Sequence, residues 1–255
     1  YSESMKKMLE FEKKALNLQR ITLSAFIDKN EAHLGGAFSM IEILLAVNEV
    51  ALKKNDKFLL SKAHASFPFL IYLKSKGIKV SLKTHLELDP SKGIHCTAGS
   101  LGHGLPIAVG MAFAKKLKKN NDKIYISISD GECQEGTTWE SLLIASKHKL
   151  DNLVLIIDYN KIQALTKLED GLPLKNLAAK FKSFNWNTLN IKNGHSFSMI
   201  LKALNKKKIK DKPTVIIANT IKGKGIKEFE NNPIRHARKL NEKEISIAKK
   251  RLKII

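Results

Sequence analysis

Cysteine, acidic residues and long apolar runs are all scarce in this chain of 255 residues. Cys96 and Cys133 are the two cysteines, and they form neither a CxxC pair nor a repeated spacing, which favours reduced thiols over a disulfide framework. No run approaches the roughly 18 uninterrupted apolar residues that a membrane span needs, and the first residues contain no apolar stretch of the signal-peptide type. We therefore expect a cytoplasmic protein that does not enter a membrane.

The shortage of acidic residues leaves a formal net charge of +21. A basic patch is the electrostatic footprint of phosphate binding, so a nucleic-acid binder is one interpretation. Most of the excess is lysine scattered through helical segments such as "KKLKKNNDK" and "LNKKKIKDK", without interleaved aromatic residues or a recognisable nucleic-acid module. A solvated charged face explains this distribution as well, and we expect no nucleic-acid partner.

Hydrophobic residues make up 43% of the chain, which is enough for one large α/β domain, expected to span residues 1–255. After a helical segment in the first thirty residues, short apolar runs alternate with amphipathic ones. Strands are predicted at 56–61, 123–129, 152–158, 184–191 and 213–220. Helices are predicted at 40–52, 67–77, 101–119, 137–149, 196–208 and 241–255, and a loop at 31–39. Right-handed crossovers between such elements predict a mostly parallel sheet flanked by helices on both faces.

Two polar residues directly follow predicted strands. Asp130 comes after the strand at 123–129, and Asn160 lies just past the strand at 152–158. One helical crossover separates these strands, so they can be neighbours whose carboxyl ends share one edge, where ligands bind in open parallel sheets. Together with a carbonyl near Ile162, they would offer Mg²⁺ three hard oxygens, and Gly131 would let the backbone approach a phosphate. The alternative is that Asp130 and Gly131 form a tight turn and Asn160 caps a loop.

A wider pattern supports the metal interpretation. The segment "SDGECQEG", followed at this spacing by "DYNKI", resembles the thiamine-diphosphate motif, and "ECQEGTTWE" resembles the version found in transketolases. Four more segments resemble the same family in the same chain order: "AHLGGAFSMIEIL", "LSKAHASFPFLIYL", "GSLGHGLPIAVGMA" and "TIKGKGIKEFENNPIRHA". The resemblance covers nearly the whole chain and implies the thiamin diphosphate-binding fold.

The transketolase resemblance implies that thiamine diphosphate is bound through a divalent metal, Mg²⁺ or alternatively Ca²⁺ or Mn²⁺. The implied metal ligands are Asp130, Asn160 and the main-chain carbonyl of Ile162. The implied cofactor contacts are His64 and Gly131 at the diphosphate, the main chain of Gly99 and Leu101 at the aminopyrimidine, and Asn160. Glu135 resembles the family's carboxylate at the subunit contact, and Glu132 is expected to be structural.

Three histidines lie in family motifs: His33, His103 and His236. The resemblance implies that His33 and His236 face the sugar hydroxyls, where an imidazole with a pKa near neutrality can move a proton. The alternative is that these histidines cap loops, which we prefer for His148 and His195. A zinc site is a weaker alternative, because no HxxxH or HxH spacing occurs.

The resemblance implies transfer of a two-carbon ketol unit from a ketose donor to an aldose acceptor. Full-length transketolases carry a pyrimidine-binding domain and a C-terminal domain for which this sequence has no segment, so we expect the N-terminal subunit of a split transketolase. Its expected partner is a separate C-terminal subunit, in a homodimer of heterodimers that uses sugar or sugar-phosphate substrates. Alternatives are a non-catalytic scaffold or regulatory subunit, a deoxyxylulose phosphate synthase and a dihydroxyacetone synthase. The sequence does not identify the sugar.

Overall fold

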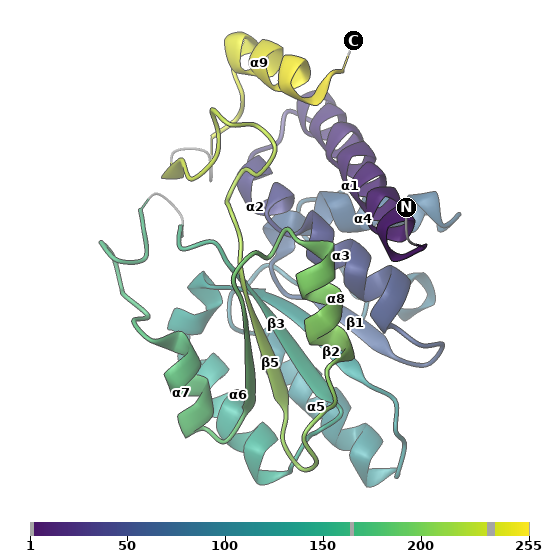
Figure 1. Ribbon diagram of the computed structural model, residues 1–255, viewed down its shortest axis with the longest axis vertical. Helices are drawn as coiled ribbons and strands as arrows, with labels where there is room; N and C mark the ends of the chain where they lie inside the picture. Colours follow the sequence, from purple (N-terminus) through teal and green to yellow (C-terminus); the bar gives the residue numbers. More distant parts are fainter. Residues whose placement is uncertain (1–2, 164–165, 234–237, 255) are drawn as a thin grey trace.

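The computed structural model describes residues 3–163, 166–233 and 238–254. Within these residues, five parallel strands form one sheet in the spatial order β1-β2-β3-β5-β4 (Figure 1). The strands are β1 (Lys57–Leu60), β2 (Ile124–Ser129), β3 (Leu153–Tyr159), β4 (Asn187–Ile191) and β5 (Thr214–Asn219). The expected parallel sheet is confirmed, and β2 and β3 are neighbours as the site hypothesis requires.

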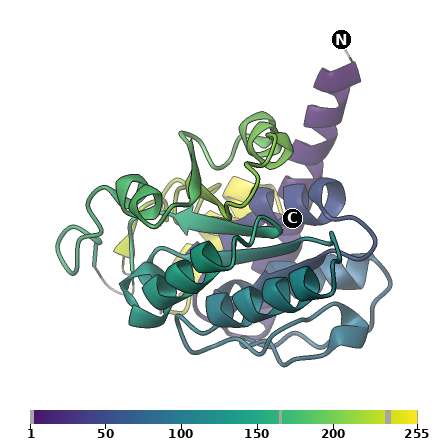
Figure 2. The same cartoon turned by 90° about the horizontal axis from the view of Figure 1, so that it is seen from below.

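Helices cover both faces of the sheet (Figures 1 and 2). The α-helices are α1 (Glu3–Asp28), α2 (Leu34–Phe38), α3 (Ile41–Ala46), α4 (Ser66–Ser75), α5 (Gly104–Leu117), α6 (Gly136–Lys147), α7 (Leu177–Ser183), α8 (Phe197–Asn205) and α9 (Glu242–Leu252). Short 3₁₀ turns lie at η2 (Ala63–Ala65), η3 (Pro90–Lys92) and η4 (Gly131–Gln134), and α3 continues into a π-helical turn, η1 (Val47–Ala51). Helices α5 and α6 lie side by side over one face, and α3 and α8 cover the other.

The central strands are buried along nearly their whole length because both of their faces are covered. All six residues of β2 are buried, and so are all residues of β3 except the last, Tyr159. Most of these residues are apolar, with Ser127, Ser129 and Asp158 as buried polar exceptions, because the strands of parallel sheets covered on both faces are mainly apolar and lack the alternation of half-exposed strands. The sheet therefore forms a rigid base, and polar side chains concentrate where the strands end.

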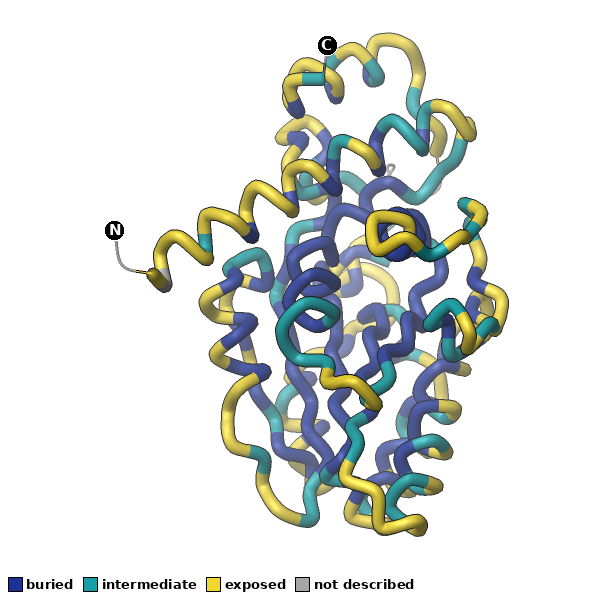
Figure 3. The backbone as a smooth tube through the Cα atoms, turned by 90° about the vertical axis from the view of Figure 1, so that its right-hand side faces the viewer, coloured by how far each residue is buried: buried dark blue, intermediate teal, exposed yellow. Residues whose placement is uncertain are grey.

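The two terminal helices pack together at one side of the domain. The first turns of α1 extend away from the body and are largely exposed (Figure 3). Farther along, Arg20 of α1 donates a hydrogen bond from Nε to the carbonyl of Leu252 in α9 at 2.6 Å. Ala248 and Leu252 are buried, so α9 has an inner face and is not wholly the surface helix that its composition indicates.

Three local expectations differ from the structure. The predicted loop at 31–39 contains the short helix α2, and the helix predicted at 40–52 ends in the π turn. The strand predicted at 184–191 begins only at Asn187, and sequence reasoning missed α7 directly before it. Among the described residues, no helix has both the length and the apolar character needed to cross a membrane.

Candidate functional site

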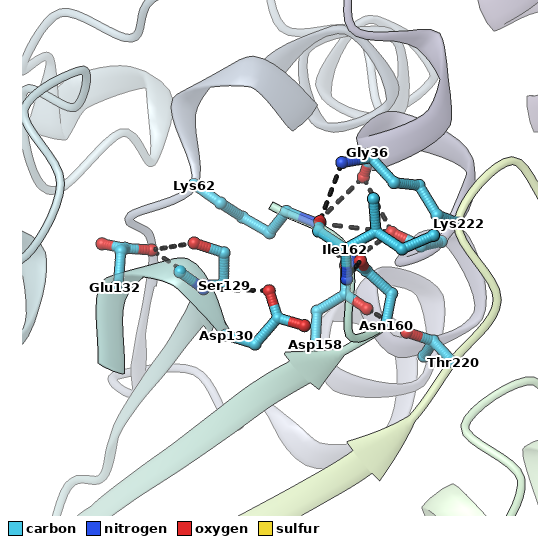
Figure 4. A network of polar contacts seen from close by, with 12 residues as sticks. Gly36, Lys62, Ser129, Asp130, Glu132, Asp158, Asn160, Ile162, Thr220 and Lys222 are labelled. Carbon is cyan, nitrogen blue, oxygen red and sulfur yellow. Dashed lines mark hydrogen bonds and ion pairs between the residues drawn. The ribbon is translucent and has the colours of Figure 1, made fainter. Parts of the chain in front are cut away.

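Asp130 and Asn160 meet at one edge of the sheet (Figure 4). Each follows the end of a strand, and β2 pairs with β3 in parallel register. Asp130 also holds the next strand's loop directly, because its Oδ2 accepts a hydrogen bond from the backbone N–H of Lys161 at 2.5 Å. Asn160 Oδ1 accepts a hydrogen bond from the backbone N–H of Ile162 at 3.1 Å, which folds this loop back on itself. The structure thus brings together the three residues predicted to bind a metal.

The Asp130 carboxylate lies in surroundings that favour a cation. Its residue is only 2% exposed, and burial, followed by the nearby Asp158 carboxylate, raises the pKa of Asp130 to about 7. Gly131 donates to Oδ1 at 2.9 Å, and a carboxylate oxygen can accept more than one such bond or a metal. Oxygens of a carboxylate, an amide and a main-chain carbonyl are the donors that Mg²⁺ prefers, so Asp130, Asn160 and Ile162 fit a hard divalent cation.

The same region does not offer the donors of a zinc site. The described part of the chain contains no group of three or more histidine, cysteine, aspartate or glutamate side chains placed to hold a metal. A metal centre at this edge would therefore consist of mixed protein oxygens.

A buried ion pair joins the elements that surround the site. The side chains of Lys62 and Asp158 are both 0% exposed and form a close ion pair. Lys62 Nζ also donates to the carbonyl of Gly36 at 3.0 Å, and Asp158 accepts hydrogen bonds from the hydroxyls of Ser39 and Thr220. Burial alone would raise the pKa of Asp158, but the Lys62 ammonium and these hydroxyls hold that pKa below its ordinary value. The network ties α2, β3 and the segment after β5 into one unit.

A second buried lysine reaches the proposed metal ligands. Lys222 is 2% exposed, and its Nζ donates to the carbonyl of Ile162 at 2.9 Å. Burial, followed by the charge of Lys62, lowers the pKa of Lys222 to about 8. Sequence reasoning did not single out these lysines, although both lie inside the segments "LSKAHAS" and "TIKGKG". The available signal was a lysine within three residues of the end of an apolar strand, which is uncommon where the chain enters a core.

A cavity of about 200 Å³ opens beside these groups. Its lining includes His64, Leu101, Asp130, Gly131, Glu135, Asn160, Ile162 and Lys222. A Cβ added at Gly131 would meet no protein atom closer than 4.0 Å, so this glycine borders open space and is not demanded by packing. The cavity therefore gathers the carboxylates of Asp130 and Glu135, one buried lysine, Lys222, and an accessible backbone turn, which suits an anion held through a metal.

His64 lines the cavity, and His33, which is not part of the lining, lies beside His64. Their ring centroids are 5.8 Å apart. A Cβ at Gly36 would stand 2.7 Å from Cδ2 of His64, so the absence of a side chain there makes room for the imidazole. His33 has a left-handed backbone, with φ of 71°, and burial, followed by the charge of Lys222, lowers its pKa. A lowered pKa favours the neutral imidazole, the form that accepts a proton.

Not every predicted residue lines the cavity. His103 is exposed, and its Nδ1 lies 3.0 Å from the carbonyl oxygen of Leu101 and 3.2 Å from Oγ of Ser100. Gly99 is also exposed, beside the ring of His85. His236 lies outside the described residues.

A larger cavity, of about 560 Å³, shares Asn160 and Ile162 with the first. Its lining contains four lysines, Lys161, Lys167, Lys192 and Lys224. No motif in the sequence pointed to it, because its lysines come from three separate loops, those after β3, β4 and β5.

Comparison with known proteins supplies the family. The family model described as "Transketolase, thiamine diphosphate binding domain" matches residues 12–254. The chain belongs to the transketolase family. A 6-deoxy-6-sulfo-D-fructose transketolase subunit from a Clostridium species is 32% identical over 256 residues, which cover 92% of this chain and 93% of the relative. An apulose-4-phosphate transketolase subunit from Actinobacillus succinogenes is 31% identical, with 96% of each chain covered.

Solved transketolases share the fold. The crystal structure of the Campylobacter jejuni enzyme matches with a TM-score of 0.84 and 28% identity. The match covers 96% of this chain but 43% of that one, so the chain spans less than half the length of this transketolase. The thiamin diphosphate-binding fold and the membership of a transketolase-type transferase family are thereby confirmed.

Three further polar residues of this transketolase family member have partners within the packed structure. Glu132 is fully buried and accepts hydrogen bonds from several groups. His195, for which we preferred a structural role, accepts a hydrogen bond from the backbone N–H of Ile221 at Nε2, at 2.8 Å, while its Nδ1 lies 3.0 Å from Oε2 of Glu42. The ring of His148 packs against that of Phe113 at an interplanar angle of 50°, with centroids 4.3 Å apart.

The two cysteines are also part of the packed interior. Cys96 and Cys133 are buried and free, in agreement with the expectation of reduced thiols. Burial raises the pKa of the Cys96 thiol to about 11 and that of Cys133 well above its ordinary value. Neither thiol is therefore suited to act as a thiolate nucleophile.

Proposed function

We propose that this chain is the thiamine-diphosphate-binding, N-terminal subunit of a split transketolase that transfers a two-carbon ketol unit from a ketose to an aldose. The observation that carries the proposal is the oxygen set of Asp130, Asn160 and Ile162, which opens on the cavity beside His64. The family model is that of a thiamine diphosphate binding domain, and the set consists of the oxygen donors that a hard cation prefers, in residues that line this cavity.

Each residue then has a distinct task. Asp130, Asn160 and the carbonyl of Ile162 would hold Mg²⁺, while the backbone at Gly131 and the imidazole of His64 would contact the diphosphate. When bound, thiamine diphosphate supplies the electron sink that stabilises the donor's carbon after its bond breaks. The protein holds the cofactor in place and moves protons at the sugar hydroxyls.

The proton carriers are proposed to be His33 and His236. His33 suits this role because its lowered pKa favours a neutral ring, and it lies beside His64, which lines the cavity. We place Glu135 at the contact with the other subunit. It lies on the cavity wall, and its residue is exposed, as a group at a subunit contact must be before assembly.

An anionic sugar and a separate partner subunit are part of the proposal. The chain covers 93% and 96% of two relatives that are themselves named as subunits. The substrates in those names, a sulfo-fructose and a phosphorylated apulose, both carry a strong anion. We therefore infer a sulfonated or phosphorylated sugar as substrate, in an assembly of two copies of each subunit.

The deciding experiment measures thiamine diphosphate binding by calorimetry, with and without Mg²⁺, in the wild type and in Asp130→Ala. We expect Mg²⁺-dependent binding that Asp130→Ala abolishes and that the exposed control Asp170→Asn retains. Retention in Asp130→Ala at wild-type affinity contradicts the metal assignment.

The partner is tested by purifying the tagged chain from its native cell. A second polypeptide in equal amount is expected, and turnover of the reconstituted complex should be lost in His236→Ala. A chain that elutes alone, or a complex whose turnover survives His236→Ala, contradicts the proposed catalytic subunit and favours a scaffold.

A further inference from the structure

The buried side chain of Glu132 is surrounded by hydrogen-bond donors from three separate parts of the chain. It lies in η4, is 0% exposed, and accepts four hydrogen bonds. Oε2 accepts from the backbone N–H of Ser129 at 2.8 Å and from its hydroxyl at 3.2 Å (Figure 4). Oε1 accepts a short bond from the Ser61 hydroxyl and a longer one, at 3.3 Å, from the backbone N–H of Gly102. The four donors are uncharged and come from the end of β1, the end of β2 and the loop before α5.

The Gly102 peptide is held from two sides by the same segment. Its N–H donates to Glu132, and its carbonyl accepts a hydrogen bond from the hydroxyl of Thr137 at 2.8 Å. Gly102 has φ of 78°, and a Cβ there would stand 2.6 Å from both Cβ of Glu135 and Oγ1 of Thr137. The loop backbone therefore lies directly against the start of α6, in a conformation that favours glycine.

The two parts that Glu132 joins both line the smaller cavity. Leu101, next to Gly102, is in the lining, and so are Asp130 and Gly131, directly before Glu132. Without the hydrogen bond from Gly102 to Glu132, loop 99–103 would be connected to the segment that begins at Asp130 mainly through the hydrogen bond from the Thr137 hydroxyl. A carboxylate suits the position because all four neighbours donate, and it accepts at both oxygens without presenting a donor of its own.

We propose that Glu132 is a positioning residue that fixes loop 99–103 relative to the turn at Asp130 and Gly131. This inference rests on the proposed function, in which the turn holds the diphosphate and the main chain at Gly99 and Leu101 meets the aminopyrimidine. Glu132 then sets the distance between the supports for the two ends of the cofactor. Its loss weakens the contact with the ring end while the diphosphate contacts, which Asp130 and Gly131 make themselves, persist.

The substitution Glu132→Gln isolates this role. A glutamine amide keeps one acceptor oxygen and turns the other into an NH₂ group. The oxygen is expected to face Ser129, whose N–H makes the shorter bond, and the NH₂ can donate to the Ser61 hydroxyl. The N–H of Gly102 then faces another N–H, so the loop loses this one contact while packing and volume stay nearly unchanged.

The first measurement is hydrogen exchange of individual amides by NMR. In Glu132→Gln, exchange of the Gly102 amide should rise about tenfold or more, because one hydrogen bond of ordinary net strength is removed. The buried amide of Ile156 in β3 serves as an internal reference for global unfolding and should be unchanged. Ser61→Ala, which removes a different donor, and the exposed control Glu12→Gln should leave Gly102 exchange at the wild-type rate. Unchanged Gly102 exchange in Glu132→Gln, or an equal rise at Ile156, contradicts the proposal that Glu132 holds loop 99–103.

The second measurement compares two ligands by calorimetry in the presence of Mg²⁺. Thiamine diphosphate affinity should fall about tenfold in Glu132→Gln, whereas inorganic pyrophosphate affinity should stay within about twofold of the wild type. Equal losses of affinity for both ligands contradict the proposal that Glu132→Gln weakens only the contact with the aminopyrimidine end. A wild type that binds neither ligand contradicts the proposed function instead, and the exchange measurement still decides whether Glu132 holds the loop.

Discussion

The ion pair between Lys62 and Asp158 permits a sharp stability prediction. Lys62→Met keeps the length and most of the volume of the side chain but leaves the fully buried Asp158 carboxylate without its cation. Removing one partner of a buried pair costs about 3–5 kcal/mol. Losing the hydrogen bond to the Gly36 carbonyl adds about 1 kcal/mol. Because the Ser39 and Thr220 hydroxyls still solvate the carboxylate, we expect the free energy of unfolding to fall by about 4 kcal/mol.

The assay is urea denaturation followed by circular dichroism, with a double variant and an exposed control. In Lys62→Met with Asp158→Asn, the buried charge is gone and about 2 kcal/mol or more should return, because uncharged replacements of a buried pair are often tolerated. Lys83→Met removes a lysine from an exposed pair with Glu87 and should cost less than about 0.5 kcal/mol.

The pH dependence follows from the pKa of Asp158. In the wild type this pKa lies below its ordinary value of 3.8, so its stabilising contribution is complete above about pH 4 and is lost as pH falls through the folded-state pKa. In Lys62→Met, burial without a cation raises the pKa above that value, so stability falls as pH rises from about 4. The gap between the two proteins should be wider at pH 8 than at pH 5. A loss below about 1 kcal/mol, or a double variant no more stable than the single one, refutes this reasoning.

Three further predictions concern other sites. Gly36→Ala should push the His64 ring aside, since the new Cβ would stand 2.7 Å from it, and lower thiamine diphosphate affinity in calorimetry; Gly110→Ala, with no atom within 4 Å of its Cβ, is the matched control. Lys208→Met should raise the free energy of unfolding at pH 7 by about 2 kcal/mol, because burial lowers the pKa of Lys208 to about 8 and its Nζ has no hydrogen-bond partner in the described part of the chain. The gain in the free energy of unfolding should shrink as pH rises from about 8 to 10.5, because the Lys208 amine of the folded wild type loses its proton over this range. A gain that stays constant with pH in urea denaturation would contradict this prediction. Asn241→Ala removes the capping box of α9 and should cost about 1 kcal/mol, so an unchanged urea midpoint would show that the cap contributes nothing.

Much of the fold was readable from the sequence because its signals are local. Mainly apolar runs identify β2, β3 and β5, whose residues are nearly all buried, and the helical periods between them predict parallel crossovers. The elements that were missed are short. Helix α2 has five residues and α7 has seven, and tertiary packing stabilises helices of that length more than their own sequence does.

By itself, the sequence determined that Asp130 and Asn160 each follow a strand, so that they could share one edge of the sheet; the pairing of β2 with β3 was decided only by the tertiary structure, in which β3 and β4, also one crossover apart, are not neighbours. Tertiary structure alone decided which groups surround them. Lys62 meets Asp158 across 96 positions of the chain, Glu132 meets Ser61 across 71, and no local pattern encodes such partners. The physical reason is that a buried charge must be stabilised by charged or hydrogen-bonding groups close to it in space, and the packing of the whole sheet and its helices determines which groups those are.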